Sequence, residues 1–182
     1  MSHANWGSRA GVTVLVFTLT AGSGNAAAEP VHDDEDLAVR STDVAVAGLI
    51  ETAGRESPTF RSMVESIRSA KGIVYIIPGK CGHGVRSCLV DVLPAGGRRI
   101  LRVKVDVRKP DPELMASIGH ELRHALEVLS DPSVKSGNAM FHFFKRTATM
   151  GAGRTFETPA AVLAGDTVGR EIREFRRREG AR

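Results

Sequence analysis

Residues 111–130 constrain this chain more than any other stretch, because they combine a strong helix pattern with a pair of histidines. Asp111 followed by Pro112 is typical of a helix start, where an aspartate caps the first turn and a proline fills the first helical position. Ser-Asp-Pro at 130–132 ends the pattern. The sequence therefore predicts a helix of about eighteen residues with one apolar side. Its apolar residues recur at intervals of three and four: Leu114, Met115, Ile118, Leu122, Ala125, Leu126 and Leu129.

Within this helix, residues 120–124 read His-Glu-Leu-Arg-His. His120 and His124 would lie one turn apart on the same face, so both imidazoles could bind one metal ion. A catalytic zinc typically has three protein ligands and leaves its fourth position to water. Glu121 could flank such a water without binding the metal, which predicts a general base. The alternative is an ordinary surface or core helix in which the pattern occurs by chance.

Small and apolar residues around the motif favour a buried helix. Gly119, directly before His120, costs about 1 kcal/mol relative to alanine inside a helix. Its presence indicates that another segment of the chain approaches closely there. Buried histidines and a buried glutamate need polar partners, and this need favours a metal site over a solvated helix.

The run Ser-Ile-Gly-His-Glu-Leu-Arg-His-Ala-Leu at 117–126 resembles the active-site helix of the zincin metallopeptidases. It most resembles the gluzincin branch, because no third histidine follows at the metzincin spacing. The resemblance implies that His120 and His124 are zinc ligands and that Glu121 is the catalytic glutamate. Residues 118–128 also resemble a helix found in small secreted bacterial proteins.

A third metal ligand is expected from elsewhere, because two histidines rarely hold zinc alone. In gluzincins this ligand is a glutamate from a later helix, and by position and residue type the resemblance points to Glu157. Asp166, two turns further along, is the alternative. Glu127 lies on the stripe of His120, but a straight helix carries it away from the ion, so we expect it to support a ligand or pair with an arginine. Glu157 could also be a glutamate favoured by the dipole at a helix start.

The remaining periodicity predicts an α+β fold. Its third strand alternates apolar and charged residues, which is typical of a sheet with one buried face. We expect a small antiparallel three-stranded sheet packed on helices, zincin-like, with the motif on a central helix. The expected elements are helices at 43–52, at 57–71 and from 156 onward, strands at 73–77, 87–93 and 98–107, and an aromatic-rich core segment at 139–150.

Residues 1–28 have the pattern of a secretory signal peptide. Arg9 is followed by an apolar run at 10–21 that is too short to span a bilayer, and then by three alanines before Glu29. The composition of the chain, 42% apolar and 25% charged, is that of a globular protein, and 182 residues suggest one domain. We expect a secreted or periplasmic protein with a loose segment at 29–42, a single zincin-like domain within 29–182 and no membrane span.

The two cysteines, Cys81 and Cys88, flank the loop between the first two predicted strands. In an exported protein such a pair across a hairpin loop is expected to form a disulfide. The alternative is a metal site that includes His83.

These features together predict a zinc-dependent hydrolase, specifically a metallopeptidase. His120, His124 and Glu157 would hold Zn²⁺, and Glu121 would act as the general base. In zincins a sheet edge beside the motif helix pairs with an extended peptide, so by resemblance the substrate would be a peptide or protein and the strand at 98–107 would bind it.

Two other classes of protein remain open. One is a catalytically inert metal-binding domain that retains the motif helix, and the other is an envelope interaction module that works through an exposed apolar patch on the hairpin. A nucleic-acid partner is not expected, although the pI is about 9.4 and residues 170–182 are basic. The net charge is only +4, and no nucleic-acid-binding module is present in the sequence.

Overall fold

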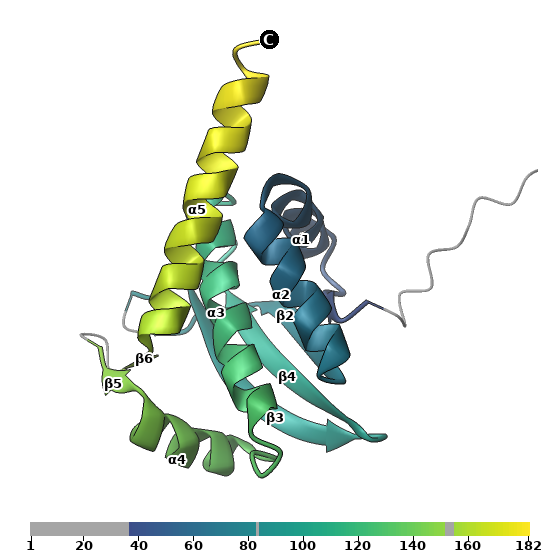
Figure 1. Cartoon of the computed structure of the whole chain (residues 1–182), viewed down its shortest axis with the longest axis vertical. Coiled ribbons are helices and arrows are strands. Elements are labelled where there is room, and N and C mark those ends of the chain that lie inside the picture. Colours follow the sequence, from purple (N-terminus) through teal and green to yellow (C-terminus); the bar gives the residue numbers. More distant parts are fainter. Residues whose placement is uncertain (1–36, 83, 152–154) are drawn as a thin grey trace, which may run out of the picture. The chain divides into compact units, whose positions relative to one another are not determined.

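The computed structural model describes residues 37–82, 84–151 and 155–182 (Figure 1). The predicted signal peptide, the first part of the expected loose segment and His83 lie outside these residues. The helices are α1 (Val44–Glu56), α2 (Pro58–Ser69), α3 (Pro112–Ser130), α4 (Gly137–Thr147) and α5 (Pro159–Glu179), and the strands are β1 (Val39–Arg40), β2 (Gly72–Pro78), β3 (Ser87–Ala95), β4 (Arg98–Val105), β5 (Thr149–Met150) and β6 (Phe156–Glu157).

The main sheet has four strands in the order β1-β2-β4-β3, and β5 pairs with β6 in a separate two-stranded ribbon. β2 is parallel to both β1 and β4, whereas β3 and β4 form an antiparallel hairpin. The α+β class is confirmed, but the expected antiparallel sheet of three strands is wrong. After β2 the chain crosses to the far edge of the sheet as β3 and returns as β4 between them, so β2 and β3 never pair.

Strand β1 adds an edge to the sheet where a loose segment was expected. Val39 pairs with Val74 of β2, and Ala38 and Val39 are both buried. Burial of these apolar side chains explains why residues 37–42 are ordered against the sheet, because removing apolar surface from water is favourable. The other residues of the expected loose segment, 29–36, lie outside the described part of the chain.

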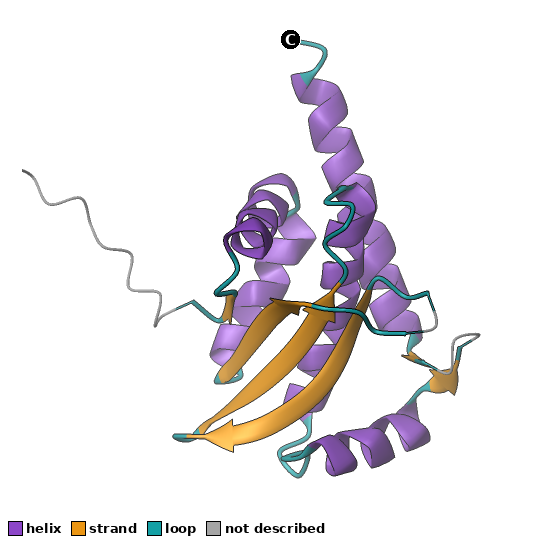
Figure 2. Cartoon of the chain, turned by 180° about the vertical axis from the view of Figure 1, so that it is seen from behind, coloured by secondary structure: helices purple, strands orange, loops and turns teal. Residues whose placement is uncertain are grey.

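The large helices cover one face of the sheet, and Figure 2 shows the opposite face turned toward the viewer. α3 lies against the sheet and runs beside α5 (Figure 1). Small residues permit this close approach: a Cβ added at Gly119 would lie 2.9 Å from Cγ2 of Val168, and one at Gly169 would lie 3.1 Å from Cβ of Ala116. The close neighbour predicted for Gly119 is therefore confirmed.

Both ends of α3 are fixed to the strands. At its start, the Asp111 side chain accepts a hydrogen bond from the backbone N–H of Leu114 at 2.9 Å and pairs with Arg86, which precedes β3. At its end, the guanidinium of Arg99 in β4 donates hydrogen bonds to backbone carbonyls at the last turn of α3 and in the loop that follows it. A cation at this position also complements the negative end of the helix dipole. The acceptors are the carbonyls of Val128, Leu129, Asp131 and Val134.

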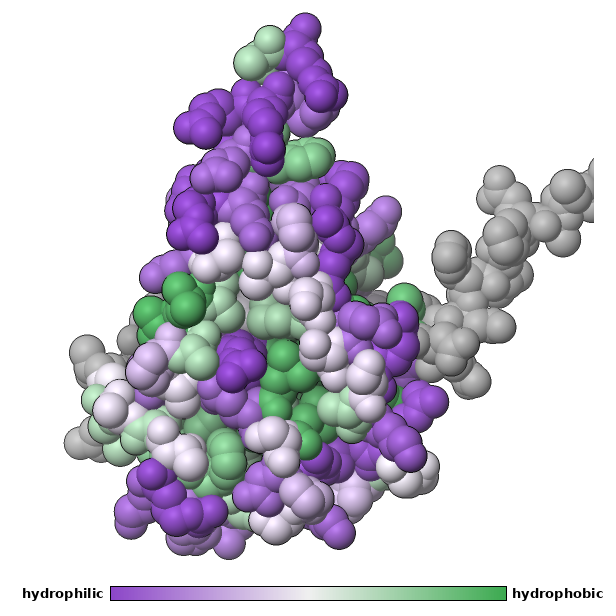
Figure 3. Space-filling model, in the orientation of Figure 1, coloured by the Kyte–Doolittle hydropathy of each residue, from purple (hydrophilic) through white to green (hydrophobic). Residues whose placement is uncertain are grey.

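The C-terminal part of α5 is largely hydrophilic (Figure 3). Arg176 pairs with the buried carboxylate of Glu56 at 2.7 Å, so this basic segment also ties α5 to α1. Among the described residues, none of the helices combines the length and hydropathy needed to cross a bilayer.

Candidate metal centre

Three side chains from two distant parts of the chain converge beside α3. His120 and His124 come from the helix and Glu157 from β6, and one ligand atom of each lies within 4.8 Å of the others. Nε2 of His120 lies 3.2 Å from Oε2 of Glu157, and the two imidazole ring centroids are 4.7 Å apart. This group could hold a metal ion. The structure therefore brings together the three residues that the sequence analysis selected as ligands.

Glu157 lies in a strand, whereas the sequence predicted that it would lie at the start of the last helix. It lies in β6, opposite Thr149 of β5, and α5 begins two residues later with Thr158 as its cap. The Oγ1 of Thr155 donates a hydrogen bond to Oε1 of Glu157 at 2.9 Å. The short ribbon thus holds one carboxylate oxygen and leaves the other, Oε2, beside His120.

The two alternative third ligands lie outside this group. Asp166 is exposed on α5, and Glu127 accepts a hydrogen bond from the Oγ1 of Thr158 at 2.7 Å. The other oxygen of Glu127 lies 2.9 Å from Nδ1 of His124. Glu127 therefore supports a histidine, as the sequence analysis expected, and Arg123 lies 3.7 Å from the same carboxylate.

His124 offers a free nitrogen to the group. Burial alone would raise the pKa of Glu127, but its hydrogen bonds with His124 and Thr158 outweigh burial and lower that pKa. An ionised Glu127 is satisfied by a hydrogen on Nδ1 of His124, which leaves the lone pair on Nε2. That Nε2 is buried and has no hydrogen-bond partner among the described residues. A metal ion would satisfy it, so the donor set fits the proposed ion.

The surroundings of His120 favour its neutral form. Burial lowers the pKa of His120, and the neighbouring His124 lowers it further, while Glu157, Glu127 and Asp166 oppose these effects. A lowered pKa favours the neutral imidazole, whose lone pair can coordinate an ion.

The carboxylate of Glu121 is held by the edge strand β3. Its Oε2 accepts a hydrogen bond from the backbone N–H of Leu89 at 2.7 Å, and its Oε1 accepts one from the hydroxyl of Ser87 at 3.0 Å. The hydroxyl of Ser117 lies 2.6 Å from that of Ser87 and completes the chain as a donor. Burial raises the pKa of Glu121, although His124, Ser87 and Leu89 oppose the shift. Glu121 is thus a buried carboxylate with increased proton affinity.

A cavity of about 600 Å³ opens beside these residues, and His120, Glu121, His124 and Glu157 all line it. Aromatic rings form one wall: Phe144 packs edge-on against His124 with centroids 5.0 Å apart, and Phe156 stacks on Phe144. The proposed base and ligands therefore share one accessible space, as an enzyme site requires.

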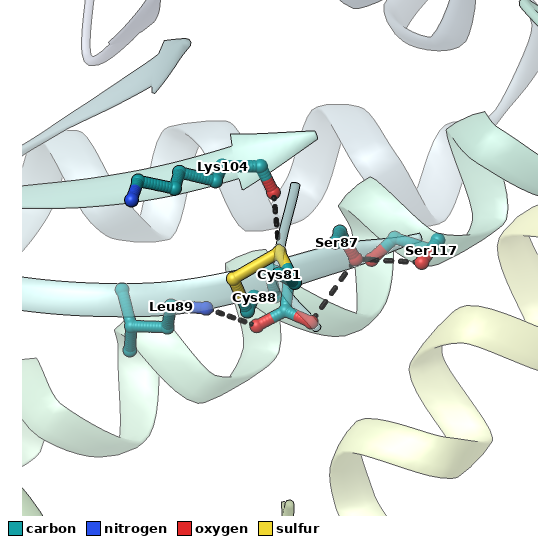
Figure 4. The surroundings of a disulfide bond; sticks show 7 residues. Cys81, Ser87, Cys88, Leu89, Lys104 and Ser117 are labelled. Carbon is teal, nitrogen blue, oxygen red and sulfur yellow. Dashed lines mark hydrogen bonds between the residues drawn. A yellow bond between two sulfur atoms is a disulfide. The ribbon is translucent and has the colours of Figure 1, made fainter. Parts of the chain in front are cut away.

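The predicted disulfide between Cys81 and Cys88 is confirmed. It excludes the alternative metal site, because both sulfurs are used. The expected position in a hairpin loop is wrong, since the bridge joins the segment after β2 to the edge strand β3. Cys88 lies between Ser87 and Leu89, the two residues that bind Glu121 (Figure 4). The bridge therefore holds the part of β3 that positions this carboxylate.

Sequence reasoning missed the residues that hold the site. The Ser-Cys-Leu start of β3 gave no signal of its contact with Glu121, because that contact depends on how the sheet folds. Thr158 before Pro159 did have the pattern of a helix cap, and its hydroxyl accepts from the N–H of Ala161 at 3.1 Å while contacting Glu127.

The alternative of an interaction module expected an exposed apolar patch on the two strands joined by the disulfide, at 73–77 and 87–93. Leu93, 47% exposed, is the only exposed large apolar side chain of β2 and β3 within the described structure. Phe141, Met150, Val162 and Leu163, which are also exposed, belong to α4, β5 and α5.

Comparisons of this chain with protein-family models, curated proteins and solved structures found no match. The resemblance to zincins therefore rests on residues 117–126.

Proposed function

We propose that this protein is a zinc-dependent hydrolase that cleaves peptide bonds. The observation that carries the proposal is the buried, unpartnered Nε2 of His124, which lies with His120 and Glu157 beside a cavity that a buried carboxylate, Glu121, also lines. Two imidazoles and one carboxylate are a donor set typical of catalytic zinc sites. The disulfide supports a secreted or periplasmic location, because such bridges persist in oxidising compartments.

Zinc, when bound, supplies Lewis-acid chemistry by lowering the pKa of a coordinated water and polarising the scissile carbonyl. The residues of the chain supply the proton transfers. Glu121 takes a proton from the attacking water on its carboxylate and returns it to the leaving nitrogen, and burial raises the pKa of Glu121, which increases its affinity for that proton. Its bonds to Ser87 and Leu89 fix the carboxylate in one orientation.

The strand that would pair with a peptide is β3. The strand at 98–107, which the sequence analysis assigned to this task, is the central strand β4 and has neighbours on both sides. β3 has a strand neighbour on one side only within the described residues, and Leu89 binds Glu121 from its other side. A peptide extended along that side would bring its backbone to the metal group.

Metal content of the purified chain tests the proposal. We expect about one zinc per chain by elemental analysis. His124→Ala should lose the metal, because it removes the buried nitrogen. His142→Ala is the matched control, since His142 is exposed on α4 and does not line the cavity. Native protein without zinc, and with none taken up on addition, would contradict the proposal.

Glu121→Gln tests the catalytic step separately. The amide can still accept from the N–H of Leu89 and can donate to Ser87, whose hydroxyl then donates to Ser117, so the network is retained in reverse. We expect this variant to keep its zinc and to lose peptide cleavage by at least about 100-fold, as assayed by mass spectrometry of a peptide mixture. Unchanged cleavage would show that Glu121 is not the base.

A further inference from the structure

The cavity contains two acidic side chains that the proposed metal site does not use. Glu113 lies in the first turn of α3 and Asp166 in α5, and both are exposed at the lining of the same cavity. Glu113 precedes His120 by seven residues, so it stands two turns away on the same face, at about 10 Å along the helix. Asp166 follows Gly165, which packs against His120: a Cβ added at Gly165 would lie 3.1 Å from Cβ of His120.

The charges of these two acids are not compensated. Within the described residues neither forms an ion pair, and the only Lys or Arg that lines the cavity is Arg86, which already pairs with Asp111. The two positive charges of a divalent ion would balance the negative charges of Glu121 and Glu157. Glu113 and Asp166 then leave two negative charges facing the bound substrate.

We propose that this cavity selects peptides that carry a lysine or arginine side chain close to the cleaved bond. The proposal deepens the proposed function and rests on it. The buried, unpartnered Nε2 of His124, which the metal ion would satisfy, marks the same cavity as a place where a ligand binds. An extended chain advances about 3.3 to 3.6 Å per residue, so the 10 Å span along α3 places the cationic side chain within about three residues of that bond. The aromatic part of the lining, at Phe144 and Phe156, offers no such charge.

The size of the preference follows from exposure. Ion pairs between exposed groups contribute about 0.2 to 1 kcal/mol, so each carboxylate should favour a lysine peptide over its glutamine counterpart by about 1.4- to 5-fold. Together they should give about 2- to 25-fold if their effects add. The preference should shrink in 1 M salt, where the Debye length is only about 3 Å.

The test uses blocked hexapeptide libraries, each with lysine, arginine, glutamine or leucine fixed at one position and the others randomised. The zinc-loaded Glu121→Gln protein is used to measure binding without turnover, by the enrichment of each library on the immobilised protein. We expect enrichment of the lysine and arginine libraries at one or more positions. Adding Glu113→Gln and Asp166→Asn together should abolish that enrichment.

Glu51→Gln with Glu174→Gln is the charge-matched control, because it removes the same two charges from sites that do not line the cavity. The enrichment of the lysine and arginine libraries on this control should equal their enrichment on the Glu121→Gln protein without further substitutions. Equal binding of all four libraries, no binding of any of them, or the same loss in the control as in the cavity variant would overturn the inference.

Cleavage by the native zinc protein separates this inference from the proposed function. Cleavage of all libraries at one rate would leave the hydrolase standing and remove the charge preference. Preferential binding of the cationic libraries without any cleavage would remove the hydrolase and keep the cation-selective cavity.

Discussion

Replacing Arg99 with methionine should strongly destabilise the protein, although Arg99 lies outside the proposed site. Its guanidinium donates to four carbonyls at the end of α3, and three of these, at 2.9, 2.7 and 3.2 Å, share one nitrogen. That nitrogen carries only two hydrogens, so we count its contacts as two full hydrogen bonds, and the second terminal nitrogen adds a third bond, to Leu129. Bonds to a charged group contribute about 1.5 to 3 kcal/mol each, which predicts a loss of about 4.5 to 9 kcal/mol in the free energy of unfolding.

Arg102→Met is the matched control, because Arg102 stands on the same strand. It is 46% exposed and makes one salt bridge, to Asp91 at 3.1 Å, so its loss should cost less than about 1 kcal/mol. Arg99→Lys should fall between the two, since one ammonium cannot reproduce the planar fork of a guanidinium. Urea denaturation of the four proteins measures these free energies. Equal losses in Arg99→Met and Arg102→Met would refute the reasoning.

Two further predictions concern the supports of α3 and β3. Replacing both Cys81 and Cys88 with serine should lower the free energy of unfolding by about 2 to 3 kcal/mol relative to the oxidised native protein, measured in urea. Reduction of the native protein should cause a similar loss, and a native chain that loses nothing on reduction would contradict this. Burial favours a higher pKa for Asp111, but hydrogen bonds from Arg86, the N–H of Leu114 and Lys109 lower that pKa from 3.8 to about 2. This stabilisation is present above the unfolded-state pKa of about 3.9 and is lost as the pH falls through about 2. The urea midpoint of the native chain should therefore drop more steeply between pH 5 and pH 2 than the midpoint of Asp111→Asn. Parallel curves for the two proteins would contradict this role of Asp111.

The motif helix could be predicted from the sequence because its determinants are local. The Asp111 cap and the apolar repeat depend on residues within one or two turns of each other. The close neighbour at Gly119 follows from a single steric requirement, the lack of room for a side chain. The pairing of the two histidines follows from helix geometry alone. The support of His124 by Glu127 follows in the same way, since three residues on a helix bring two side chains together.

The sheet could not be predicted in the same way, because strand pairing is decided by contacts between distant segments. The hairpin expected after β2 required neighbouring strands to pair, yet β4 lies between β2 and β3. One signal was available: residues 73–77 are apolar without alternation, which is typical of a strand with parallel neighbours. The contacts of Glu121 with β3 depend on that topology, so they were also beyond the reach of local patterns.

The polar groups buried along α3 carry an energetic cost that argues for a ligand. A helix that served only to fill the core would be more stable with apolar residues at positions 121 and 124, since burying a carboxylate or an imidazole nitrogen is unfavourable unless it is paired. Glu121 is paired twice by β3, which offsets its cost, but Nε2 of His124 is left without a partner within the described chain. Native proteins leave such atoms unsatisfied mainly where function requires it. Exchanging His124 for leucine should therefore abolish zinc binding and stabilise the metal-free chain relative to the metal-free native protein. A loss of stability in the metal-free state would contradict this reasoning, because it would show that His124 is retained for its contact with Glu127 and not for a ligand.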